Sequence, residues 1–172
     1  MNRCIMVVFA LAPALLAQTD GSKNALSGEI KQAYTTIKNN LIKAAESMPE
    51  ENYSFKPSPD IRTFGALVAH IADANTFYCS AMQGAMKRPN AGSKTSKADI
   101  VAALKTAFSD ECDSVYDSLT DAAANEMVKV RSNEMTKMGV AIRNLGHDNE
   151  EYGYLAVYLR MKGIVPPSSA GK

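Results

Sequence analysis

The chain has 172 residues, of which 46% are hydrophobic and 22% are charged, and its 19 Lys and Arg residues nearly balance 18 Asp and Glu. This length and composition predict one globular domain with a sizeable core and argue against disorder. The neutral charge balance and the absence of tryptophan argue against nucleic acid as the main partner, because there is no basic excess to neutralise phosphates and little aromatic surface for base stacking.

The first 17 residues have the pattern of a secretory signal peptide. Arg3 supplies a positive charge, an apolar run covers residues 5–16, and Ala17 stands before polar residues. We predict cleavage near Ala17, which leaves residues 18–172 as a periplasmic or secreted domain. The alternative is an uncleaved N-terminal anchor, although the run is short for a membrane span. No later apolar run is long enough to span a bilayer, so we expect no membrane association of the mature domain.

Four later segments carry apolar residues at steps of three and four, which is typical of one buried face of a helix. These segments cover residues 26–48, 64–82, 100–119 and 138–159. Pro49 ends the first, and Ser96 with Asp99 forms a capping-box pattern before the third. Gly163 stands where a C-terminal cap of the fourth belongs. Signals for β-strands are nearly absent, so we predict an all-α protein that folds as a four-helix bundle.

Two cysteines, Cys79 and Cys112, remain after the predicted cleavage. An exported protein can form a disulfide, and two is an even number. Two small buried side chains in helices explain the same residues equally well. Their spacing in the sequence leaves both interpretations open.

His70, His147 and Glu151 are the candidate metal ligands. Both histidines fall in predicted helices, and Glu151 shares a helix face with His147 because it follows four residues later. Two imidazoles and a carboxylate suit a divalent transition metal, and three protein ligands leave a coordination position open. The ordinary alternative is a boundary histidine and a His/Glu pair that stabilises its own helix.

Several segments of the chain resemble the DinB-like family, whose members are related to bacillithiol- and mycothiol-dependent transferases. The segments that carry the resemblance are residues 49–57, 64–65, 69–74, 146–153 and 158–167, and the similarity extends over essentially the whole mature chain. The resemblance implies a four-helix bundle in up-down-down-up order. It also implies a divalent metal, zinc or nickel, held by three histidines of the second and fourth helices. His70 and His147 match two of these histidines, and Glu151 stands at the position of the third.

The resemblance has further implications for the cysteines and the quaternary structure. In the family order the second and third helices run parallel, which brings Cys79 and Cys112 to similar heights and permits a disulfide. In a simple up-down bundle the two would be offset by about two helical turns, too far for a bond. Pairing through helix faces in the family makes a homodimer plausible.

We therefore expect an exported metal-binding protein, either a metal-dependent hydrolase or a thiol transferase that acts on a small molecule. The alternative is a non-catalytic metal- or ligand-binding bundle whose three-histidine site is altered at Glu151. Asp73 and Asn149 are candidates to orient an imidazole, with solvation or helix hydrogen bonding as the ordinary roles. We interpret Asp148 and Glu150 as solvated charges. Tyr78 and Tyr152 are expected either to line the mouth of a cavity at the metal site or to pack in the core.

Overall fold

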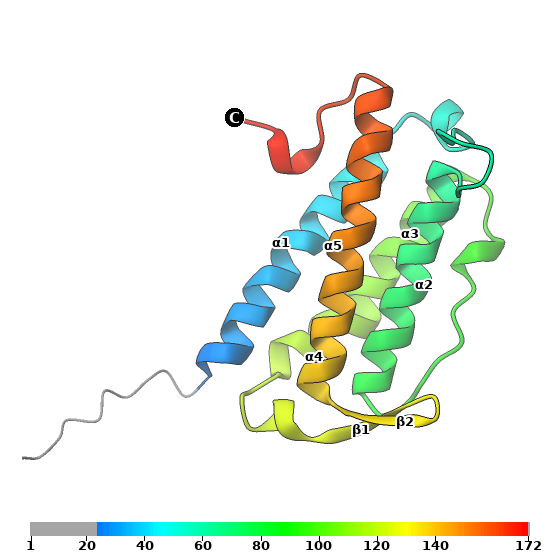
Figure 1. Ribbon diagram of the computed structural model, residues 1–172. Coiled ribbons are helices and arrows are strands. Elements are labelled where there is room, and N and C mark those ends of the chain that lie inside the picture. Colours follow the sequence, from blue (N-terminus) through cyan, green and yellow to red (C-terminus); the bar gives the residue numbers. More distant parts are fainter. Residues whose placement is uncertain (1–23, 172) are drawn as a thin grey trace, which may run out of the picture.

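The computed structural model describes residues 24–171, and the predicted signal peptide lies outside the described residues. Four long helical segments form the body of the molecule. Figure 1 shows how they are arranged. The helices and strands have the following bounds: α1 Ala25–Ser47, α2 Phe64–Met82, α3 Lys97–Thr106, α4 Asp113–Ser118, β1 Met127–Val130, β2 Asn133–Thr136 and α5 Lys137–Met161. A π-helical segment, Ala107–Cys112, joins α3 to α4, so these two helices act as one segment of the bundle. Short 3-10 turns occupy Glu50–Asn52, Ala91–Ser93, Ala123–Asn125 and Pro167–Ser169.

The bundle has the up-down-down-up order that the family resemblance implies. In Figure 1, α1 and α5 run upward, whereas α2 and the α3–α4 segment run downward. The connection after α2 crosses back along the bundle, so α2 and α3 lie side by side and parallel. Helix α5 packs against both α1 and α2, and α3 completes the bundle against the same two helices. The prediction of an all-α four-helix bundle is confirmed.

Local signals explain where the helices begin and end. Thr63, Ser96 and Thr136 each accept a hydrogen bond from a backbone N–H of the first turn of α2, α3 and α5. Gly163 has a φ of 72°, the left-handed conformation that ends α5 as predicted. Helix α1 is capped differently, because the Asp121 carboxylate accepts from the N–H groups of Leu26 and Ser27 at 3.3 and 2.7 Å.

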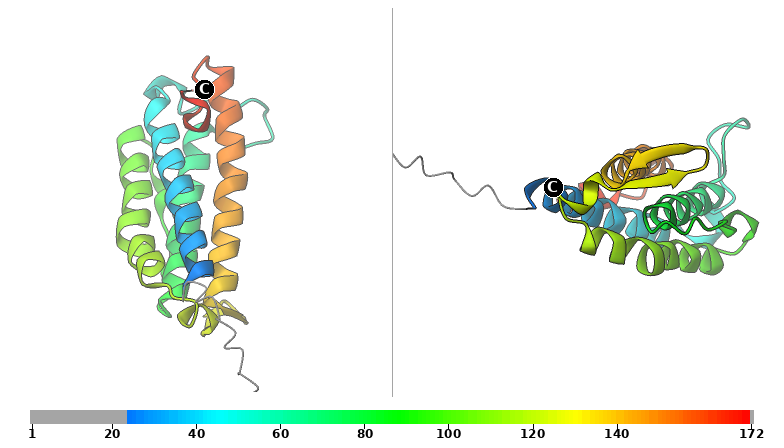
Figure 2. Two further views of the ribbon diagram at one scale, coloured as in Figure 1. Left: turned by 90° about the vertical axis from the view of Figure 1, so that its left-hand side faces the viewer. Right: turned by 90° about the horizontal axis from the view of Figure 1, so that it is seen from below.

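One short pair of strands, which the sequence did not predict, accompanies the helices. β1 and β2 form an antiparallel hairpin that lies across the lower end of the bundle (Figure 2). Its turn contains Arg131 at a φ of 59°, where glycine or asparagine is usual. The strands are only four residues long and the usual turn residue is missing, so the sequence lacked both signals of a hairpin.

The core lies between the four helical segments and agrees with most of the predicted apolar faces. Its largest fully buried side chains are Tyr116, Phe64, Phe108, Leu41, Met48, Ile71, Met82, Leu104, Leu155, Leu159, Val68 and Val140. Leu26 and Ile142, which we expected on buried faces, are about half exposed, at 54% each. Among the described residues, no helix is apolar and long enough to cross a membrane.

Candidate metal centre

His70, His147 and Glu151 meet between α2 and α5. Nε2 of His70 lies 3.1 Å from Nε2 of His147, and Oε1 of Glu151 lies 3.5 Å from each of these nitrogens. The side chains of His70, His147 and Glu151 are 34%, 19% and 9% exposed. The residues chosen from the sequence therefore form one candidate metal-ligand cluster. Among the described residues, it is the one group of His, Cys, Asp and Glu side chains whose ligand atoms lie close enough to share an ion.

The distances within the cluster fit a shared ion. Ligand atoms about 2.1 Å from one ion lie about 3.0 to 3.4 Å apart in octahedral or tetrahedral geometry. The three observed separations, 3.1, 3.5 and 3.5 Å, are close to this range. At 3.5 Å the carboxylate is too far from either ring for a good direct hydrogen bond, so the two Nε2 atoms, at 3.1 Å, are the one pair among the three that can form one. A cation between the three atoms would interact with all of them.

Unpaired polar atoms around the cluster agree with this fit. Within residues 24–171, Oε2 of Glu151, Nδ1 of His147 and Oδ2 of Asp148 are buried and have no hydrogen-bond partner. A buried polar atom without a partner costs free energy, so such atoms are rare in stable proteins unless a site requires them. Oδ1 of Asn144 and Oε2 of Glu111 are also unpaired, so three of the five such atoms in the described residues belong to residues 147–151 at the cluster.

Burial and neighbouring charges shift the pKa values of all three candidate ligands. Burial lowers the pKa of His70, and the positive charge of Arg62 adds to this, so His70 is neutral near pH 7 and its lone pair is available. The neighbouring Asp148 raises the pKa of His147. Burial also raises the pKa of the Glu151 carboxyl. A cation would favour the ionised form of this carboxyl and relieve its desolvation.

Asp148 was wrongly interpreted as a solvated charge, because its side chain is fully buried. Its Oδ1 accepts a 2.8 Å hydrogen bond from Nδ2 of Asn75, and Nδ1 of His147 lies 3.8 Å away, beyond hydrogen-bonding distance. Burial raises the pKa of the Asp148 carboxyl. The residue therefore lies directly behind the His147 ring, where a carboxylate can orient an imidazole. In the sequence it falls on the predicted apolar face of the last helix, between Leu145 and Tyr152, but this spacing alone does not show that a carboxylate there is buried.

Asp73 and Asn149, the candidates to orient an imidazole, make hydrogen bonds elsewhere. Asp73 accepts hydrogen bonds from the backbone N–H groups of Ala91 and Gly92, at 2.7 and 3.1 Å, and so holds the crossing connection against α2. Asn149 donates to the carbonyl of Leu145 within its own helix, as the ordinary interpretation expected.

Tyr78 and Tyr152 lie in different parts of the molecule. Tyr78 lines the cavity at the cluster, whereas Tyr152 lies elsewhere and its hydroxyl accepts from the N–H of Ser168.

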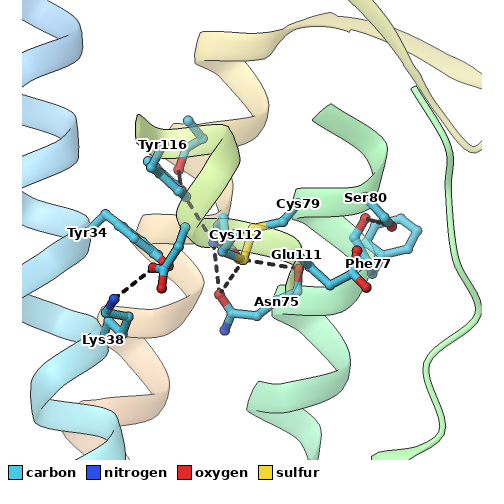
Figure 3. Close-up of a disulfide and its surroundings, with 12 residues drawn as sticks. Tyr34, Lys38, Asn75, Phe77, Cys79, Ser80, Glu111, Cys112 and Tyr116 are labelled. Atoms are coloured by element: carbon cyan, nitrogen blue, oxygen red, sulfur yellow. Dashed lines mark hydrogen bonds and ion pairs between the residues drawn. A yellow bond between two sulfur atoms is a disulfide. The ribbon is translucent and has the colours of Figure 1, made fainter. Parts of the chain in front are cut away.

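Cys79 and Cys112 form a disulfide between α2 and the π-helical segment. Figure 3 shows Asn75 pointing toward this disulfide, and Sγ of Cys112 lies 3.7 Å from Oδ1 of Asn75. Asn144 donates to the same Oδ1 at 3.0 Å. Asn75 therefore connects the disulfide to Asp148 and the metal-ligand cluster. The parallel course of α2 and α3 brings the two cysteines together, as the resemblance implied.

The fold and the site together define a class: helical-bundle proteins with a candidate metal site. In this chain the site consists of two histidines and one carboxylate that face each other from the second and last long helices. A family model described as the DinB superfamily matches residues 33–155. The chain belongs to the DinB superfamily.

Solved structures agree with this assignment at the level of the fold. A DinB-like protein from Bacillus cereus ATCC 10987 is 18% identical, with a TM-score of 0.71 over 81% of this chain and 95% of that one. A DinB-like protein from Bacillus subtilis is 20% identical, with a TM-score of 0.63 over 78% of this chain and 92% of that one. No protein of curated function matches the sequence at a significant level.

Proposed function

We propose that the domain binds one divalent transition metal, zinc or nickel, through Nε2 of His70, Nε2 of His147 and Oε1 of Glu151. The observation that carries this proposal is the convergence of these three atoms at 3.1 to 3.5 Å from two helices. Two imidazoles and a carboxylate are a donor set that zinc enzymes use. Glu151 replaces the third histidine of the family pattern with a harder, charged ligand, which lowers the net charge of the loaded site.

We further propose that the loaded site catalyses a hydrolase or thiol-transferase reaction on a small molecule. A bound divalent ion supplies Lewis-acid chemistry at the coordination positions that the protein leaves open. The chain contributes the neutral His70 ring, the charge of Glu151, and a cavity of about 560 Å³ that borders all three ligands. Phe77 and Tyr78 line this cavity and give it apolar surface beside the reaction centre.

Hydrolysis is the better supported of the two reactions if the protein is exported. The predicted signal peptide would take the domain away from the low-molecular-weight thiols of the cytosol, which a transferase needs. Water is present in every compartment. Mass spectrometry of the protein from its native host tests the export step: the mature N-terminus is expected at or near Gln18, and a chain that retains residues 1–17 contradicts it.

Metal analysis of the purified protein tests the site itself. We expect about one zinc or nickel per chain in the unaltered protein and in Glu150→Gln, whose changed side chain is exposed on the same helix. In His147→Ala the metal should be lost while the helical circular dichroism spectrum is retained. Absence of metal from the unaltered protein after loading with zinc and with nickel would overturn the proposal.

Activity is tested separately from binding. The loaded protein is assayed with ester, amide and thiol-transfer substrates, before and after removal of the metal with a chelator. A turnover that disappears with the metal and returns on reloading supports an enzyme. Stoichiometric metal without turnover of any class favours the non-catalytic binding protein instead.

A further inference from the structure

The cavity at the metal-ligand cluster continues along the groove between α2 and α5 to the hairpin. Besides the three ligands, its walls include Phe77, Tyr78, Arg131, Met135 and Arg143. Arg143 precedes His147 by four residues, which is about 6 Å along the helix axis. On α2 the lining runs from His70 to Tyr78, about 12 Å along the helix axis, so the cavity is elongated, with the proposed metal toward one end and two arginines toward the other.

The two guanidinium groups have no acidic partner. Within residues 24–171, neither Arg131 nor Arg143 forms an ion pair or a side-chain hydrogen bond. Asp73 and Glu151 are the acidic residues of the cavity wall. Both oxygens of Asp73 already accept backbone N–H groups, and Glu151 belongs to the metal-ligand cluster. The arginine end of the cavity therefore carries uncompensated positive charge.

The backbone of the hairpin holds Arg131 in an unusual conformation. Its φ of 59° is the one positive value among the non-glycine residues that the structure describes. A left-handed conformation costs an arginine free energy and tends to be kept where the position of the side chain matters. Arg131 is exposed, and its guanidinium lies 5.1 Å from the centre of the Phe77 ring, a cation–π contact that favours a position beside the cavity wall.

We propose that this cavity binds an elongated small molecule that carries an oxyanion, a carboxylate or a phosphate, at the end remote from its reacting group. Arg131 and Arg143 bind the oxyanion, because a guanidinium donates paired hydrogen bonds that match such groups. Phe77, Tyr78 and Met135 contact an apolar chain between the two ends, and the reacting group meets the metal. This inference rests on the proposed function and adds the class of substrate to it.

Metal-binding probes of graded length test the proposal without an assay of turnover. The protein is loaded with cobalt(II), and suberic monohydroxamic acid is titrated in while the visible spectrum of the cobalt is recorded. Its methyl ester, which lacks the remote charge, is the matched probe, and the corresponding hydroxamate with a terminal phosphate distinguishes the two oxyanions. Shorter dicarboxylic monohydroxamates measure the distance from metal to arginine. Hydroxamates are preferred to thiols because thiols reduce the Cys79–Cys112 disulfide.

We expect the free acid, or the phosphate, to bind at least about tenfold more tightly than the ester, the effect of one charge-assisted contact. Arg143→Gln and Arg131→Gln should each bring the ratio toward one. Arg160→Gln, at the far end of α5, removes the same charge and should leave the ratio unchanged. Equal affinity for acid and ester in the unaltered protein overturns the inference, and so does a preference that survives both cavity variants. A failure of cobalt to bind would instead contradict the proposed metal site.

Discussion

Nδ2 of Asn75 donates a hydrogen bond of 2.8 Å to the fully buried carboxylate of Asp148, across the interface between α2 and α5. The same side chain accepts a hydrogen bond from Asn144 and lies against the disulfide. A layer of buried polar side chains thus lies between α2 and α5, directly behind His147. Because each of these groups is cut off from water, the layer is stable only while its hydrogen bonds are made.

Replacing Asn75 with alanine is expected to lower the free energy of unfolding by about 1–3 kcal/mol, because the buried Asp148 loses a donor. Denaturation in urea, followed by circular dichroism, measures the change. Asn149→Ala is the control, since that side chain is exposed and makes one bond to its own helix; its effect should stay within about 0.5 kcal/mol. Equal effects of the two substitutions would show that the polar layer contributes nothing specific.

Changes at Glu151 test its proposed role as the third ligand. Glu151→Gln removes the charge and should weaken zinc or nickel binding by about tenfold or more, measured by competition with a chromogenic chelator. Glu151→His restores the donor set of the family pattern and should keep stoichiometric metal. Undiminished affinity in Glu151→Gln would mean that the carboxylate is not a ligand. Glu150→Gln, one residue away and exposed, serves as the control.

Asp121 gives α1 a cap from a distant part of the chain, and this cap should depend on pH. Hydrogen bonds from Ser27 and Leu26 hold the pKa of its carboxyl below the ordinary value. A lowered pKa in the folded state means that the carboxylate contributes stability above its unfolded pKa of about 3.9, and that this contribution is lost as the pH falls through the folded value. Asp121→Asn should therefore be less stable than the unaltered protein at pH 7, and the difference should shrink below about pH 4.

Thermal unfolding from pH 7 to pH 3 measures this difference for Asp121→Asn. Asp60→Asn, which changes an exposed carboxyl in the loop before α2, should match the unaltered protein over the same range. A stability difference at Asp121 that stays constant down to pH 3 would assign the effect to something other than the carboxylate charge.

The disulfide should contribute much of the stability of the domain. Cys79 and Cys112 are 33 residues apart, and closing a loop of this length in the unfolded chain corresponds to about 3–4 kcal/mol. The double variant Cys79→Ala/Cys112→Ala is expected to lose this much free energy of unfolding and so to unfold at a lower urea concentration. A reductant should lower the urea midpoint of the unaltered protein and leave that of the double variant unchanged. Alkylation of the unreduced, unfolded protein should modify neither cysteine; modification of both would contradict the disulfide.

The sequence by itself determined the helices and the three candidate ligands. Apolar residues at steps of three and four mark a helix because burial of one face drives its packing, and Ser96 and Gly163 set helix ends through local bonds. His70, His147 and Glu151 were identified from residue chemistry, helical spacing and the resemblance to the DinB-like family.

Tertiary structure alone decided which polar residues lie inside. Asn144, Asp148 and Glu151 follow one another at steps of four and three on the inner face of α5, where a pattern search expects apolar side chains. A buried carboxylate is stable there only because Asn75 of another helix donates to it, and no local pattern encodes a partner 73 residues away. The disulfide likewise required the parallel course of α2 and α3, which the connection between them determines and the cysteine spacing does not.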